Sequence, residues 1–223
     1  MTRTKNYHHF CPIARSLEVI GEKWSLLVVR DLLRGPARFS DLMRYLGGIT
    51  PKWLTARLRE LEAAGIITRD SQPGRREVWY KLTEKGKGLG PVIEGLLVWG
   101  VDNALRPPLP GEAVFPEQTV YATATYHNSK GTQLPQPVEW QIDLDDGKSH
   151  AVSFDGKRWR PRRLSDGPPD VAVTADRDSW MRFVTTPRAE RELHGLAIQG
   201  HPERVEEFLR TFGVLQASMA AVS

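Results

Sequence analysis

The chain has 223 residues, of which 40% are hydrophobic and 26% charged, and its mean hydropathy is −0.41. This composition is typical of a soluble globular protein, and no apolar run approaches the roughly 18 residues of a membrane span. The net charge of +4 is uneven: residues 1–106 hold 18 Lys and Arg against 11 Asp and Glu, whereas residues 107–223 hold 13 against 16. We therefore expect only the first half to meet a polyanion such as DNA.

Two further properties concern the compartment. The first ten residues lack the apolar core of a signal peptide, so we expect a cytoplasmic protein. Cys11 is the single cysteine, which rules out an intrachain disulfide and fits a reducing environment.

The first hundred residues predict helices followed by a hairpin. Apolar residues at helical spacing predict helices over 12–20, 23–33 and 39–46, and a fourth that starts at Pro51 and is closed by Gly65. Alternating residues then predict strands over 66–69 and 77–82, joined by a turn. A last helix is expected over 84–105, with apolar residues on too wide a surface for one neighbour. That helix is interpreted as a dimer interface, with a buried linker helix as the alternative.

The fourth helix carries the clearest functional pattern. Thr50 suits the N-cap and Pro51 the first helical position. The leucines at 54, 58 and 61 form an inward stripe, which leaves a short basic face outside. Taken alone, this pattern fits a solvated surface helix as well as a helix that enters the major groove of DNA.

The order of elements decides between these readings. Two helices, a glycine turn between two more, and a hairpin with a basic tip are typical of a winged helix-turn-helix. A solvated helix does not explain why the basic hairpin follows it. The candidate DNA contacts are Arg38, Ser40, Thr50, Pro51, Lys52, Thr55, Arg57, Arg59, Arg75 and Arg76.

A proline-rich segment separates the two halves. Residues 107–111 are predicted as the linker between a DNA-binding and dimerisation domain at 1–106 and a second domain at 112–223. In the second domain, strands are predicted over 120–126, 138–144, 151–154, 159–163, 171–174 and 196–200. A helix capped by Asp176 or Asp178 and another over 203–212 complete it. The expected fold is α+β, with an antiparallel sheet covered by helices.

Residues 11–101 resemble the HxlR family of bacterial winged-helix transcriptional regulators. The resemblance is carried by Cys11-Pro12-Ile13, Gly21-Glu22-Lys23-Trp24, Arg38-Phe39-Ser40-Asp41-Leu42, Gly48-Ile49-Thr50-Pro51-Lys52-Trp53-Leu54, Leu58-Arg59-Glu60-Leu61-Glu62 and Tyr80-Lys81-Leu82-Thr83-Glu84-Lys85-Gly86. It implies a homodimer formed by the first and last helices, which binds operator DNA. It also implies that a cysteine near the N-terminus can sense oxidants or electrophiles.

Cys11 therefore has two readings. A thiolate just before a helix start is favoured by the helix dipole and by nearby Lys5 and Arg15, which suits a redox sensor. The alternative is a small residue packed in the dimer interface. A metal site from His8, His9 and Cys11 has no zinc spacing that supports it, so no metal is expected.

The last 50 residues resemble the sterol carrier protein type-two superfamily. The resemblance is carried by residues 169–174, Trp180, Gly195, Ile198-Gln199-Gly200 and Phe212, and it implies an apolar tunnel between sheet and helices. The candidate lining residues are Trp140, Ile142, Trp180, Phe183, Leu196 and Phe208, for each of which ordinary core packing is the alternative.

Catalytic motifs are absent from the sequence, which contains no G-x-S-x-G, no H-E-x-x-H and no glycine-rich phosphate loop. We therefore expect a non-enzymatic, homodimeric DNA-binding regulator with no cofactor, whose second domain binds an apolar effector. The alternatives are a redox regulator that acts through Cys11 and a lipid carrier fused to a regulatory domain.

Overall fold

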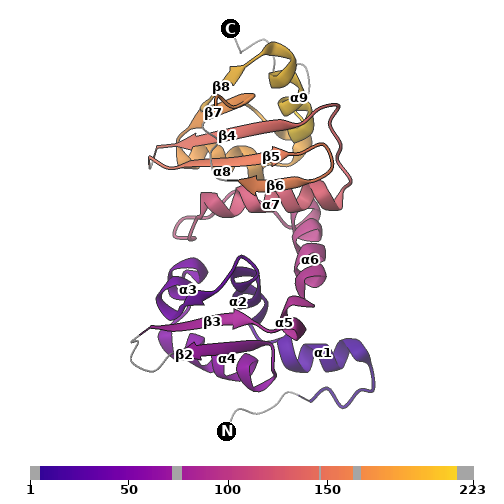
Figure 1. The fold of residues 1–223 in the computed structure, drawn as a ribbon, viewed down its shortest axis with the longest axis vertical. Coiled ribbons are helices and arrows are strands. Elements are labelled where there is room, and N and C mark those ends of the chain that lie inside the picture. The colour runs from indigo at the N-terminus through magenta and orange to yellow at the C-terminus, as the bar shows by residue number, and fades with distance from the viewer. Residues whose placement is uncertain (1–5, 72–76, 146, 163–166, 215–223) are drawn as a thin grey trace. The chain divides into compact units, whose positions relative to one another are not determined.

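The computed structural model describes residues 6–71, 77–145, 147–162 and 167–214. Its contacts divide the chain into two compact units, Met1–Gly95 and Leu96–Ser223, which we describe separately (Figure 1). The division falls ahead of the proline-rich segment at 107–111 that the sequence suggests as a linker. Among the described residues, no helix combines the length and apolarity needed to cross a membrane.

The first unit contains the four predicted helices and the hairpin. In chain order its elements are α1 Pro12–Ile20, α2 Ser25–Leu32, β1 Ala37–Arg38, α3 Phe39–Leu46, α4 Pro51–Ala63, β2 Ile67–Ser71, β3 Val78–Leu82 and α5 Glu84–Lys87. The helix α6 follows at Gly90–Asn103. The single helix expected over 84–105 is thus two helices, since Pro91 lacks the N–H of an uninterrupted helix and suits only a first turn.

A small antiparallel sheet closes the core of this unit. Its strand order is β1-β3-β2, and Ile67 lies opposite Leu82. The two-residue strand β1 was not predicted. The core against which the sheet packs is formed by Val28, Val29, Leu32, Leu42, Leu46, Ile49, Leu54, Leu58, Leu61, Ile66 and Ile67.

The second unit contains a five-stranded sheet and three longer helices. Its elements are α7 Pro116–Ser129, β4 Val138–Leu144, β5 Ser149–Phe154, β6 Trp159–Arg162, β7 Val171–Ala175, α8 Arg177–Thr185, β8 Leu196–Gly200 and α9 Pro202–Phe212. A short 3-10 turn, Arg188–Glu190, lies between α8 and β8. Five of the six predicted strands are confirmed to within two residues. Of the two predicted cap candidates, Asp176 and Asp178, the structure places Asp176 at the N-cap of α8.

The prediction of a strand over 120–126 is wrong, because these residues lie in α7. Pro116 occupies the first turn, and Val120, Ala124 and His127 form the buried face at helical spacing. The alternation of residues 120–126 is compatible with both periods. The segment forms a helix because its buried face then packs on β5 and β6.

The sheet is also mixed rather than antiparallel. Its order is β6-β5-β4-β7-β8, and the central pair β4 and β7 runs parallel, with Trp140 opposite Val171. β5 pairs along one side of β4 and β7 along the other, and β7 runs in the same direction as β4. Local sequence pattern carries no information on this choice.

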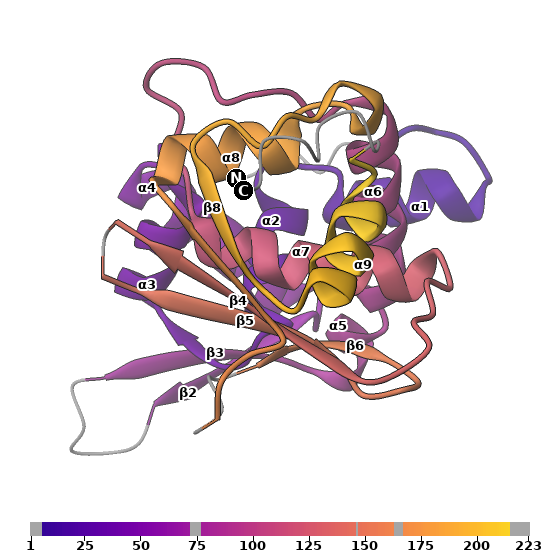
Figure 2. The ribbon, with the colours of Figure 1, turned by 90° about the horizontal axis from the view of Figure 1, so that it is seen from above.

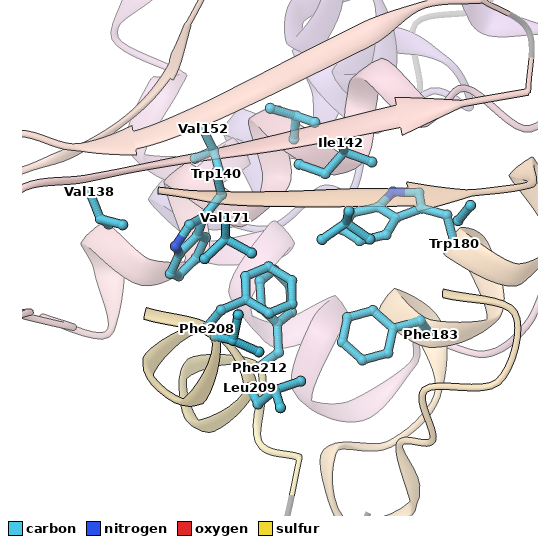
Figure 3. Packing of buried hydrophobic residues seen from close by; sticks show 14 of the residues in the cluster. Val138, Trp140, Ile142, Val152, Val171, Trp180, Phe183, Phe208, Leu209 and Phe212 are labelled. Atoms are coloured by element: carbon cyan, nitrogen blue, oxygen red, sulfur yellow. The ribbon is translucent and has the colours of Figure 1, made fainter. Parts of the chain in front are cut away.

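The helices cover one face of the sheet. Figure 2 shows α7, α8 and α9 on the same side, with α7 packed on β5 and β6, and α9 on β7 and β8. Between them lies an aromatic core in which Trp140, Phe183, Phe208 and Phe212 point toward one another (Figure 3).

Candidate nucleic-acid interface

The turn between α3 and α4 fixes where α4 begins. Gly47 and Gly48 have φ of 48° and 71°, a region that glycine enters without steric cost. Ile49 is buried at 5% exposure and anchors the turn to the core. The Thr50 hydroxyl accepts a hydrogen bond from the Trp53 backbone N–H at 3.3 Å, as an N-cap does. The helix start predicted from Thr50 and Pro51 is thus confirmed.

The inner face of α4 holds it against the first unit's core. Leu54, Leu58 and Leu61 are at most 3% exposed. Arg57 is also on this side: it is 4% exposed and its guanidinium forms an ion pair with Glu60 at 2.5 Å. The structure therefore turns Arg57 inward, away from the outer face on which a DNA contact was expected.

The outer face of α4 carries the accessible candidates. Lys52 and Arg59 are exposed, and neither forms an ion pair with a carboxylate among the described residues. Thr55 is half-buried, and its hydroxyl donates a hydrogen bond to the Pro51 carbonyl at 2.8 Å while keeping its lone pairs. Two uncompensated cations and a hydroxyl on one exposed helix face suit phosphate and base contacts.

Arg38 is occupied by contacts within the protein. Its backbone N–H and its Nε donate to the Asp41 carboxylate at 3.0 and 3.2 Å. Its Nη1 donates to Glu77 at 2.9 Å, and the guanidinium lies 5.3 Å from the centre of the Trp79 ring. Partial burial by itself would raise the pKa of Asp41, but the bonds from Arg38 outweigh it and hold that pKa below its usual value. Arg38 thus links the start of α3 to β3. The neighbouring candidate Ser40 is exposed.

The hairpin of β2 and β3 occupies the position of the wing. Its strands pair from Ile67↔Leu82 to Ser71↔Val78. The predicted contacts Arg75 and Arg76 lie outside the described residues. Arg69 on β2 is exposed, and sequence reasoning did not select it, although a basic residue in a wing strand is a signal for phosphate contact.

Cys11 lies immediately before α1, at its N-cap position, and is half-buried and free. Its backbone N–H donates to the carbonyl of His9 at 3.0 Å, and both His8 and His9 are exposed. Within the described part of the chain, no group of three His, Cys, Asp or Glu is placed to hold a metal ion.

The candidate ligand-lining residues of the second unit are packed against one another. Leu196 is half-buried, and the other five are at most 2% exposed. The rings of Trp140 and Phe208 are 5.0 Å apart, and those of Phe183 and Phe208 6.4 Å apart. The Nε1–H of Trp140 is buried and has no acceptor among the described residues.

The N-terminal part of the chain is similar to known proteins. Residues 19–107 match the model of the HxlR-like helix-turn-helix family. An uncharacterized HTH-type transcriptional regulator of Synechocystis sp. is 41% identical over 95 residues, which are 42% of this chain and 70% of that protein. The uncharacterized HTH-type transcriptional regulator YkvN of Bacillus subtilis is 41% identical over 113 residues, which are 48% of this chain and 94% of YkvN.

A solved structure shares the same segment. The redox regulator HypR in its oxidized form is 38% identical, with a TM-score of 0.40, and covers 42% of this chain and 97% of its own. The family match ends at residue 107, so the sheet of the second unit lies outside it.

Proposed function

This chain belongs to the HxlR-like helix-turn-helix family of transcriptional regulators, and from that membership we propose that it binds operator DNA as a homodimer. The observation that carries the proposal is the outer face of α4, where Lys52 and Arg59 are exposed and without an ion pair among the described residues. In the bound state, α4 of each subunit enters a major groove, and the two grooves are about one DNA turn apart. The wing residues, including Arg69, lie along the flanking phosphates.

Apolar surface supports the homodimer. On α1, Ile13 is 71% exposed and Leu17 41%. None of the 14 residues of α6 is buried, although most of them are apolar, and Trp99 is 61% exposed. On each of these helices, exposed apolar side chains at this density are typical of a surface that a partner covers.

The DNA contacts are tested by removing the two α4 cations together. A duplex selected from a randomised library by the wild-type protein serves as the probe, and its affinity is measured against salt concentration. We expect Lys52→Ala with Arg59→Ala to weaken binding at least tenfold. The slope of log K against log[salt] should shrink by about 0.9 for every phosphate contact removed.

The control removes the same charge elsewhere. Lys157 and Arg158 are exposed residues of the second unit, and their double substitution by Ala should leave both affinity and slope unchanged. Equal effects of the two pairs would show that net charge, rather than the α4 face, governs binding.

The second unit is proposed to bind an apolar effector between its sheet and helices α8 and α9, as in the sterol-carrier-like fold. Supporting this, the buried Trp140 Nε1–H has no acceptor among the residues that the structure describes, and a ligand carbonyl would satisfy it. Since Phe183 and Phe208 fill the space in front of the sheet, ligand entry requires these rings to separate. An effector changes DNA affinity only by binding the competent and incompetent dimers unequally.

The alternative is a redox regulator. The Cys11 thiol lies beside the proposed dimer face of α1, where an intersubunit disulfide or a mixed disulfide with a small thiol would alter the dimer. A third reading, a lipid carrier fused to a regulatory domain, predicts ligand transfer without any effect of the ligand on DNA affinity.

A further inference from the structure

A large apolar side chain is exposed on the recognition helix. Trp53 is 57% exposed in the first turn of α4, between exposed Lys52 and fully buried Leu54. Within the described part of the chain, its ring enters no aromatic or cation–π pair and its indole N–H has no hydrogen-bond acceptor. No contact within the described protein explains why such a large apolar side chain is exposed at this position.

The backbone of Trp53 is held at the start of α4. Its backbone N–H is held by the Thr50 hydroxyl, and the next residue, Leu54, is 0% exposed in the core. Helical side chains lean toward the N-terminus of their helix, so we expect the indole to point toward the N-terminal end of α4. The N-terminal residues of a recognition helix are the ones that reach base edges.

We propose that Trp53 packs on the C5 methyl group of a thymine and so selects T·A at one position of each half-site. The inference rests on the proposed DNA binding. An indole carries no hydrogen-bond acceptor, so it cannot pair with the amino groups that adenine and cytosine present in the major groove. The thymine methyl is the apolar feature there, and its contact with an exposed ring removes both from water.

The test replaces each thymine of the library-selected duplex by deoxyuridine, one position at a time, which deletes only the methyl group. For the wild-type protein, we expect one thymine per half-site whose replacement weakens binding about fourfold, the factor for burying one carbon. For Trp53→Ala, the same replacement should change the affinity less than 1.5-fold. Trp53→Phe, which keeps an apolar ring, should retain part of the effect.

The matched control is Trp79→Ala, since Trp79 is an exposed tryptophan of the same unit that lies on β3 instead of α4. It should leave the thymine-to-uracil ratio at about fourfold even if total affinity falls. Two results would overturn the inference while DNA binding stands. One is a roughly fourfold loss of affinity on replacing thymine by uracil in Trp53→Ala, and the other is the absence of any methyl-sensitive thymine in the wild type. If the wild type selects no duplex at all, the proposed function itself fails, and the inference with it.

Discussion

His127 places a titratable ring inside the aromatic core of the second unit. It is 3% exposed, its ring centre lies 5.1 Å from that of Trp159, and its Nδ1 lies 3.2 Å from the Thr132 hydroxyl. Burial, and secondarily the charges of Arg188 and Arg191, lower the pKa of His127 from 6.5 to about 4. The ring is therefore neutral in the folded protein at pH 5, where the unfolded chain carries a proton.

This difference makes stability depend on pH. Above pH 6.5 the ring is neutral in both states, and its contribution to stability is fully present. As the pH falls from 6.5 toward 4, only the unfolded state gains the proton, so the free energy of unfolding decreases, by on the order of 3 kcal/mol in total. We expect His127→Phe to remove this part of the acid sensitivity in urea unfolding at pH 7 and pH 5.

Exposed His194 supplies the control, because its substitution by Phe should leave the pH dependence of unfolding as in the wild type. The same slope in His127→Phe and wild type would contradict the pKa argument.

At the scale of elements, α1 shows a face with no partner in the described chain. Ile20 of its apolar stripe is buried at 7% exposure, whereas Ile13 is 71% exposed. Burying an isoleucine of this exposure in a symmetric interface contributes about 2 kcal/mol per copy. A carboxylate at the same position would have to be desolvated instead.

We therefore expect Ile13→Glu to convert the proposed dimer to a monomer in sedimentation equilibrium, with loss of tight binding to the selected duplex. Val19, 39% exposed on a different face of α1, gives the matched substitution Val19→Glu, which should stay dimeric. A dimeric Ile13→Glu variant would remove α1 from the interface.

At the scale of the whole molecule, the open question is which part controls DNA affinity. Diamide, a thiol oxidant, and oleate, an apolar probe, can each be added during titration of the selected duplex with wild type and Cys11→Ser. If the second unit is the sensor, we expect oleate to shift the affinity severalfold in both proteins and diamide to have no effect. A response to diamide in the wild type that Cys11→Ser abolishes, with no oleate effect, would establish the redox alternative instead.

Local sequence patterns are enough to predict most elements of the first unit. The N-cap at Thr50, Pro51 in the first turn and leucines at helical spacing determine α4 almost alone, because each of these signals acts within a few residues. The same holds for α3 and the hairpin strands, and their order was enough to identify a winged helix-turn-helix. The inward turn of Arg57 was not predictable, because it depends on Glu60 and on the core behind α4.

In the second unit, local patterns predict some of the elements and tertiary packing decides the others. The sequence by itself determined five strands, two helices and a cap at Asp176 or Asp178, since alternation and capping are local, and the structure selects Asp176. Only the tertiary structure decided that residues 120–126 form a helix and that β7 runs parallel to β4. Packing on the sheet overrides a short ambiguous pattern, and strand pairing joins residues that are about 30 positions apart, which no local preference encodes.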